Sequence, residues 1–155
     1  HGATLESADI SFGDLQLIDA RGENTGARFF DNADVPWHIS GVDHVLDRNF
    51  LGLTNTAIRR NAIPDAALAI PDNVVAVDWW LFTTLLLSGL KARRVPEHVA
   101  DYRIFADNEL GIGPPSSRAA LRHVIDIALR HYRAFPAIPD LALRSAHLEA
   151  LADEV

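Results

Sequence analysis

One acidic residue, Asp78, interrupts the most apolar stretch of this chain. Residues 74–90 hold no other charged residue, and Trp79 and Trp80 follow the aspartate directly. A carboxylate among apolar groups costs several kcal/mol unless it is paired, used as a helix cap or used in chemistry. Removal from water also raises the pKa of a carboxyl group, which suits it to accept a proton near neutral pH. Asp78 therefore needs an explanation, as a paired, a capping or a functional carboxylate.

The same residue fits a plainer structural role. Asp78 stands where a helix N-cap would stand, with residues 79–88 as the helix and Gly89 as the glycine that ends it. An N-cap is worth ~1 kcal/mol, and capping would also hold the carboxylate in place. The two roles are compatible, and the sequence leaves both open.

Composition limits the classes of function that the chain can have. Its 155 residues match one ordinary domain, and 48% hydrophobic with 23% charged residues are typical of a globular protein. The formal net charge of -7 works against phosphate groups, so we expect no nucleic-acid partner. The chain has no cysteine, which excludes disulfides, thiolate metal sites and cysteine nucleophiles.

The apolar stretch around Asp78 does not predict a membrane span. Residues 74–90 fall short of the ~20 apolar residues that a transmembrane helix needs, and Asp78 interrupts them. We expect a core helix there. The absence of cysteine fits a reducing compartment, so we expect a cytoplasmic protein, with any membrane association made by regions outside this chain.

The seven histidines do not predict a metal site. None of them shows the tight His-x-x-x-His spacing that places two ligands on one helix face. His38 and His44 are spaced more widely than this motif requires, and so are His123 and His131. No Ser-His-Asp arrangement, P-loop or Gly-x-Gly-x-x-Gly motif is evident, which disfavours nucleophilic hydrolysis and dinucleotide binding.

The first part of the chain reads as strands and turns. Residues 8–19 favour a strand, in which Gly13 marks a bulge or a close approach. Residues 20–26 predict a turn, and residues 31–47 a loop with a short helix. Residues 49–60 read as a second extended segment.

Later segments complete a mixed pattern. Residues 91–96 and 97–105 predict two short extended segments joined at a proline. A long helix begins at Ser116 or Ser117, because apolar residues recur there at helical spacing: Leu121, Val124, Ile125, Ala128, Leu129 and Tyr132. A last helix begins near Asp140 and carries Leu141, Ala146, Leu148 and Leu151. This order predicts an α/β layer with a C-terminal helical pair.

Three segments of the chain follow one another in an informative order. They are ADISFGDLQLIDARGE, NFLGLTNTAIRR and VDWWLFTTLLLSGLKARRVPEHVADYR, the last followed by an asparagine. In order and spacing they resemble the second half of the GT-A fold in family 2 of the nucleotide-sugar glycosyltransferases. The resemblance covers residues 3–111. It implies a partial GT-A-like mixed sheet with flanking helices in residues 1–111 and a helical extension in residues 112–155.

The resemblance also implies an acceptor side to the site. Asp78 occupies the position of the base that takes the proton of the acceptor hydroxyl during inverting transfer. Trp79, Trp80 and Asn55 are implied to contact the acceptor. The alternatives are that one tryptophan packs in the core, because adjacent helix positions point about 100° apart, and that Asn55 is structural.

Contacts to the donor diphosphate are implied for a second set of residues, Tyr102, Arg103 and Asn108. A guanidinium group there would neutralise charge that develops on the leaving group. The alternative for Arg103 is a surface ion pair with Asp101 or Asp107.

Departures from the family's pattern concern the donor half. Val77 stands where the family has an acidic residue, Phe105 stands where it has a histidine, and no Asp-x-Asp metal motif occurs. The Mg²⁺ or Mn²⁺ that the resemblance implies would therefore have its ligands outside this chain. We expect the chain to be a piece of a longer enzyme, inactive by itself, whose partners are a nucleotide-sugar donor and a sugar or lipid-linked acceptor.

A second hypothesis comes from another class of protein. The chain could be a non-catalytic interaction domain that keeps a glycosyltransferase-like half-fold. Exposed strand edges must be covered or paired, and the amphipathic helix of residues 117–135 offers a further contact face. Either feature would support a homo-oligomer or the binding of a partner protein.

Overall fold

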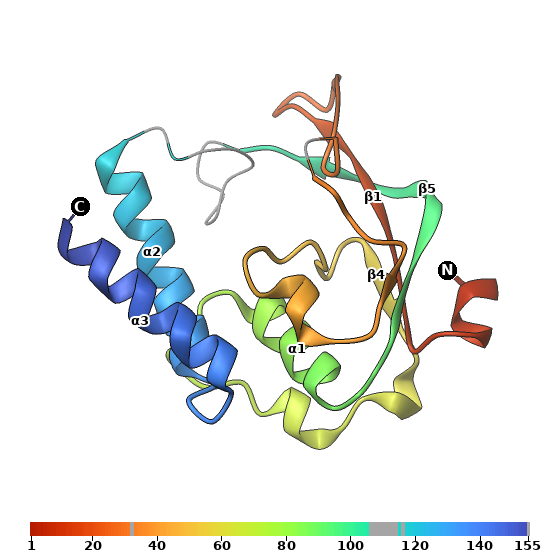
Figure 1. Ribbon diagram of the computed structural model, residues 1–155. Coiled ribbons are helices and arrows are strands. Elements are labelled where there is room, and N and C mark those ends of the chain that lie inside the picture. The colour runs from red at the N-terminus through yellow and green to blue at the C-terminus, as the bar shows by residue number, and fades with distance from the viewer. Residues whose placement is uncertain (32, 106–114, 116, 155) are drawn as a thin grey trace.

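The computed structural model describes residues 1–31, 33–105, 115 and 117–154. A curled mixed sheet lies beside the helix α1 (Val77–Leu87), and α2 (Arg118–Arg133) and α3 (Pro139–Glu154) lie beyond α1 (Figure 1). The strands are β1 (Ile10–Ile18), β2 (Asn24–Arg28), β3 (His38–Ile39), β4 (Thr56–Ile58) and β5 (Ala92–Arg103). This mixture of strands and helices confirms the predicted α/β class.

The central strand of the sheet is β1. It runs parallel to β5, and it pairs antiparallel with β4 along its first half and with β2 along its second half. The two-residue strand β3 adds antiparallel to the start of β5. Parallel neighbours need a long crossover connection, and α1 lies within the connection from β1 to β5. Along the chain, α1 therefore comes directly before β5, the parallel neighbour of β1.

Gly13 allows β5 to approach β1 closely. A Cβ atom at this position would lie 2.4 Å from Val99 Cγ1 and 2.9 Å from Val95 Cγ2. The pairing of β1 with β5 is irregular at the same point, between Phe12 and Asp14. The predicted close approach at Gly13 is confirmed, because any larger residue would push the strands apart.

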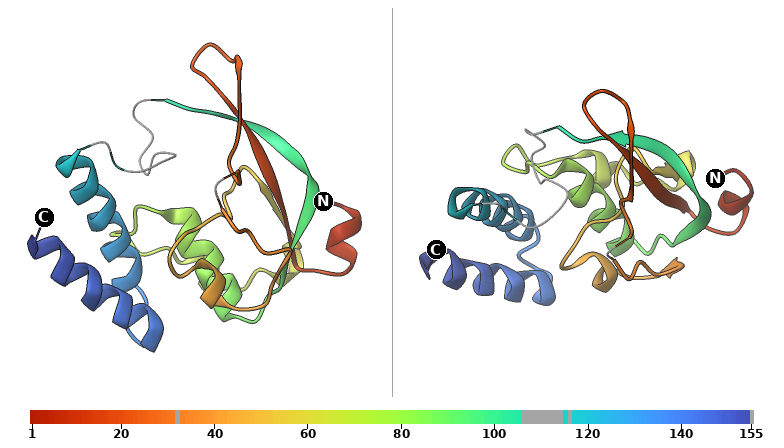
Figure 2. Two further views of the ribbon diagram at one scale, coloured as in Figure 1. Left: turned by 45° about the horizontal axis from the view of Figure 1, so that its top comes forward. Right: turned by 90° about the horizontal axis from the view of Figure 1, so that it is seen from above.

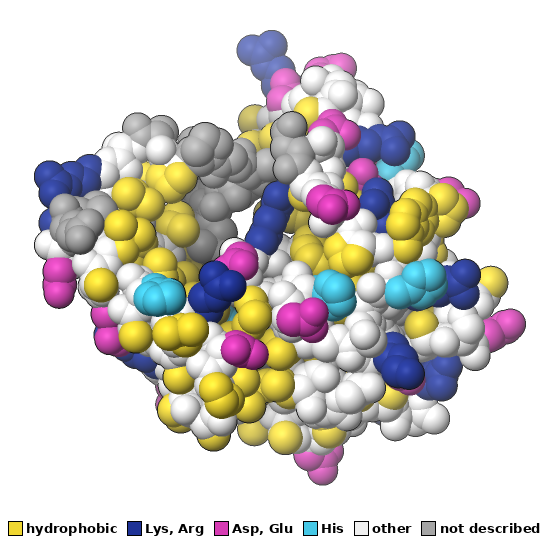
Figure 3. All heavy atoms as spheres, in the orientation of Figure 1, with side chains coloured by type: hydrophobic (Ala, Val, Ile, Leu, Met, Phe, Trp, Pro, Cys, Tyr) yellow, Lys and Arg dark blue, Asp and Glu magenta, His cyan; other side chains and the backbone are white. Residues whose placement is uncertain are grey.

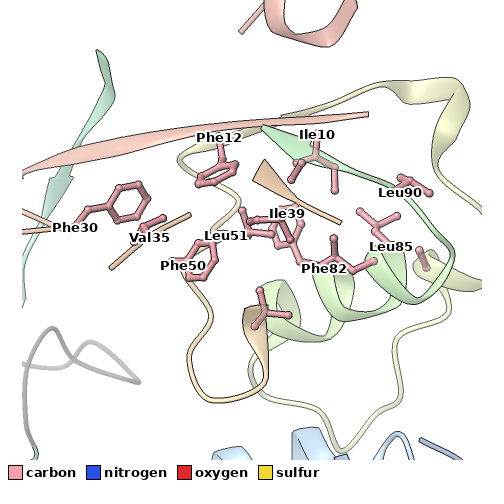
Figure 4. Close-up of a cluster of buried hydrophobic side chains, with 14 residues drawn as sticks. Ile10, Phe12, Phe30, Val35, Ile39, Phe50, Leu51, Phe82, Leu85 and Leu90 are labelled. Carbon is pink, nitrogen blue, oxygen red and sulfur yellow. The ribbon is translucent and has the colours of Figure 1, made fainter. Parts of the chain in front are cut away.

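A first group of buried side chains, here the sheet cluster, joins α1 to the sheet. Figure 4 shows Ile10 and Phe12 of β1 on one side of it, with Phe82 and Leu85 of α1 on the other. Its buried members are Ile10, Phe12, Phe30, Val35, Ile39, Val45, Phe50, Leu51, Ala67, Phe82, Leu85, Leu86, Leu90 and Ala92. Burial of a large apolar side chain is worth about 1.5–3 kcal/mol, so this cluster holds α1 firmly in place.

A second group, here the helix cluster, joins α2 and α3 to α1, and Figure 2 shows the helix pair from two further sides. Its buried members are Leu46, Val74, Ala76, Trp79, Trp80, Ile127, Ala128, Tyr132, Phe135 and Leu141. The predicted start of α2 is confirmed, since the Ser117 hydroxyl accepts a hydrogen bond from the Ala120 amide at 3.1 Å. No helix among the described residues combines the length and the hydrophobicity needed to cross a bilayer.

Some predicted segments differ from the structure. Of residues 49–60, only β4 is a strand, because a turn at Gly52–Asn55 takes the earlier residues out of the sheet. The two extended segments predicted on either side of Pro96 form one strand, β5, whose register with β1 shifts near the proline instead of ending there. Residues 24–26 of the predicted turn belong to β2.

Candidate functional site

The structure places Asp78 in the first turn of α1, so the predicted N-cap role is wrong. Ala76 is the N-cap, and no side chain caps this end of the helix. The carbonyl of Ala76 accepts the hydrogen bond from the Trp80 amide at 3.0 Å, and the helix therefore starts two residues earlier than expected. The Asp78 carboxylate instead folds back onto its neighbour, and Oδ1 accepts from the Trp79 amide at 2.8 Å.

The surroundings of Asp78 favour its protonated form. Burial raises the pKa of the carboxyl group, and hydrogen bonds from the backbone amides of Trp79 and Asp78 lower it by less. The side chain is half-buried, so water and solutes still reach it. A carboxylate with a raised pKa is a better proton acceptor than an exposed aspartate, which is the chemistry that the sequence predicts for it.

A glycine turn lies against the second oxygen of Asp78. A Cβ atom on Gly52 would lie 3.8 Å from Asp78 Oδ2 and 3.2 Å from Asn55 Oδ1. A Cβ atom at Gly52 would therefore press on the Asn55 side chain and come into van der Waals contact with the carboxylate. The turn leaves Asp78 Oδ2 free of a side-chain neighbour on that flank.

Asn55 holds this turn in place. Its side chain is 0% exposed, and Nδ2 donates to the carbonyls of Gly13 at 2.9 Å and Phe50 at 3.1 Å. Its Oδ1 accepts from the Gly52 amide at 2.7 Å. These bonds use both Nδ2 hydrogens and one lone pair of Oδ1 in a fully buried side chain, which supports the structural reading of Asn55 over direct contact with an acceptor. Asn55 places Gly52 beside Asp78.

Trp79 and Trp80 both pack in the helix cluster. Each is 6% exposed, so neither presents an open ring face to a sugar in this structure. Trp79 stacks on His131 with ring centroids 4.2 Å apart and ring planes 14° apart, and Trp80 stacks on Phe135. The expectation that one tryptophan packs in the core understates the burial, because His131 of α2 covers Trp79 and Phe135, just beyond α2, covers Trp80.

Three successive residues of one loop are each held by a different helix. The Trp79 indole N–H of α1 donates to the Val45 carbonyl at 2.8 Å, and the Tyr132 hydroxyl of α2 donates to the Leu46 carbonyl at 2.5 Å. Arg144 of α3 forms an ion pair with Asp47. Sequence reasoning missed these three contacts, and it missed the stacking of His131 on Trp79. The only sequence signal was the position of Tyr132 on the apolar face of α2.

The residues expected at the donor diphosphate lie elsewhere on the sheet. Asn55 bonds to β1 at Gly13, whereas Arg103 pairs with Ile18, which is five positions or roughly 16 Å further along the strand. The Arg103 guanidinium donates to the carbonyls of Asp19 at 3.3 Å and Ala20 at 3.0 Å.

The other donor residues do not complete a site with Asp78 either. Tyr102 pairs with Leu17 on the same part of β1 as Arg103. Asn108 and Asp107 lie outside the described residues. The structure therefore brings Asp78 together with Trp79, Gly52 and Asn55, but not with Tyr102 or Arg103.

The described residues do not fit a divalent metal. Across the described ranges, no group of three or more His, Cys, Asp or Glu side chains could hold a metal ion. On the face seen in Figure 3, acidic and basic side chains lie close to one another beside the hollow between the helix pair and the sheet, so this face carries no single sign of charge. The Mg²⁺ or Mn²⁺ implied by the resemblance has no matching ligand set here.

Comparisons with known proteins found no match to this chain among family models, curated proteins or solved structures.

Proposed function

We propose that this chain supplies the acceptor side of a nucleotide-sugar glycosyltransferase, in which Asp78 is the general base. The observation that carries the proposal is the state of the Asp78 carboxyl group. It is half-buried with a raised pKa, one oxygen is fixed by the Trp79 amide, and the other lies beside a glycine. The order of segments that resembles a GT-A half-fold supports the same reading.

In the proposed reaction, Asp78 takes one proton from an acceptor hydroxyl group. The hydroxyl oxygen forms a bond to the anomeric carbon of the donor sugar while the bond from that carbon to the nucleoside diphosphate breaks. The electron pair of the broken bond leaves with the diphosphate, and attack from the opposite side inverts the anomeric centre. A general base of this kind contributes about 10²–10⁴ in rate.

The described residues divide the work within this proposal. Asp78 moves the proton, while Gly52 and Asn55 shape the space in front of it. Trp79 and Trp80 support the first turn of α1 by packing in the helix cluster, and they do not stack on the acceptor. A metal-bound donor would require ligands from outside this chain, so no step here is derived through Mg²⁺ or Mn²⁺.

The test uses the gene product that carries this chain, assayed with a panel of UDP-, GDP- and dTDP-sugars for release of the nucleoside diphosphate. Asp78→Asn should lower kcat by about 10²-fold or more while leaving donor binding within about twofold, because only the base is lost. The matched control is Asp72→Asn, which changes an exposed carboxylate shortly before α1 and should leave the rate unchanged.

Two outcomes would contradict the proposal. Transfer at the wild-type rate by Asp78→Asn would remove Asp78 from the reaction. A gene product that forms a defined oligomer and neither binds nor cleaves any nucleotide sugar would favour the non-catalytic interaction domain instead.

A further inference from the structure

His131 is the most deeply buried ionisable side chain near Asp78. The residue is 0% exposed. It lies on α2, which is separated from α1 by a long stretch of sequence. Its ring stacks on Trp79 and meets Tyr132 and Phe135 edge-on, with centroids 5.4 Å and 5.3 Å away. His131 is thus enclosed by aromatic rings, with its flat face against the residue that follows Asp78.

Hydrogen bonding does not explain why a histidine occupies this position. Nδ1 finds no hydrogen-bond partner among the described residues, and Nε2 has only a long contact of 3.5 Å to the Thr83 hydroxyl. Burial lowers the pKa of the His131 ring to about 3, so the ring is neutral at physiological pH. What this side chain offers Trp79 is a flat, uncharged surface.

Trp79 links the His131 ring to the Asp78 carboxylate. Trp79 is held at three points: its ring by His131, its indole N–H by the Val45 carbonyl and its backbone amide by Asp78 Oδ1. The residue whose amide binds the Asp78 carboxylate is thus the residue on which His131 stacks.

We infer that His131 is a positioning residue for Asp78: by stacking on Trp79 it fixes the first turn of α1 and thereby the direction in which the Asp78 carboxylate points. The role in catalysis rests on the proposed function, whereas the structural coupling from His131 to Asp78 does not. If so, α2 belongs to the candidate site, because it carries His131.

The first test follows the Trp79 backbone amide by ¹H–¹⁵N NMR during a pH titration of this chain. In the wild type, its chemical shift should report the titration of Asp78, because the amide donates to Oδ1. His131→Leu keeps an apolar group of similar size but removes the flat ring, and it should reduce the amplitude of that titration by half or more.

Two variants serve as controls. His131→Phe restores a flat ring and should keep the wild-type amplitude. His147→Leu changes an exposed histidine on α3 and should also leave it unchanged. If His131→Leu fails to fold, the His131→Phe result decides by itself: loss of the Asp78 titration at Trp79 in that folded variant would overturn the inference, because the stack would be present without its effect.

The second readout separates this inference from the proposed function. In the transfer assay, His131→Leu should lower kcat about tenfold with little change in KM, and His131→Phe should restore it. An unchanged Trp79 titration in folded His131→Leu overturns the coupling, whatever the activity. A reduced titration in a gene product without transfer activity supports the coupling and contradicts the proposed function.

Discussion

The two sides of α1 bury their side chains in different ways. On the sheet side, Phe82 and Leu85 pack against aliphatic and phenyl groups, which contribute area but no directional bond. On the helix-pair side, Trp79 meets His131 and Tyr132, which bring rings with polar atoms. The Trp79 indole and the Tyr132 hydroxyl each donate to a backbone carbonyl there.

This difference shows how the fold separates stability from orientation. Hydrophobic burial is proportional to area and has little directional preference, so the sheet cluster contributes chiefly to the stability of α1. Hydrogen bonds and stacked rings depend on angle, so the helix cluster fixes which way the first turn of α1 points. Asp78 bonds to Trp79, and it therefore depends on the second kind of contact.

The largest effect is expected from a cavity in the sheet cluster. Phe82 is 0% exposed, and Phe82→Ala should lower the free energy of unfolding by about 3–5 kcal/mol, measured by urea denaturation. The same substitution at Phe135, at the edge of the helix cluster, should cost less, about 2 kcal/mol, because solvent can fill its site. A larger loss at Phe135 than at Phe82 would reverse the assignment of stability to the sheet side.

Acid should destabilise the fold through His131. The His131 ring has a pKa of 6.5 when unfolded and about 3 when folded, so the unfolded state binds more protons between these values. The wild type should therefore lose about 1.4 kcal/mol of stability per pH unit as pH falls from 6.5 toward 3, relative to His131→Phe. Urea denaturation of both proteins over this range measures the difference. Parallel pH profiles would show that His131 is not buried as described.

The smallest effect is expected at Asp78 itself and has the opposite sign. Because burial raises the pKa of this carboxyl group, its charged form destabilises the fold at neutral pH. Asp78→Asn should raise the unfolding free energy by about 1 kcal/mol, a common gain when a functional group is replaced. The gain should vanish as pH falls below 3.8, where both states of the wild type are protonated. Thermal unfolding at neutral and acid pH measures it, and a loss of stability at pH 7 would contradict the raised pKa.

Local patterns predict the helices of this protein well. The apolar spacing of α2 and the capping role of Ser117 follow from neighbouring residues, and the structure confirms both. The candidate residue Asp78 is visible from the sequence for a similar reason, since a single charge within an apolar run is evident without a fold. Helical periodicity and isolated charges are properties of short segments.

The contacts that shape the site have no such local signal. Asn55 bonds to Gly13, which is 42 positions away, and only the folded sheet brings the two together. His131 stacks on Trp79 because α2 packs across α1, and nothing in either segment alone indicates that pairing. The N-cap prediction for Asp78 was wrong for a local reason: the helix starts at Ala76, which has no side chain that could signal a cap.

The contacts of the loop at Val45–Asp47 with later helices imply an order in which parts of the fold form during synthesis. The partner of Leu46, Tyr132, is made 86 residues later, which corresponds to roughly 4–17 s of translation. Until then the sheet cluster can form, but the stack on Trp79 and the hold on this loop cannot. The growing chain is thus stabilised first, and the surroundings of Asp78 are completed last.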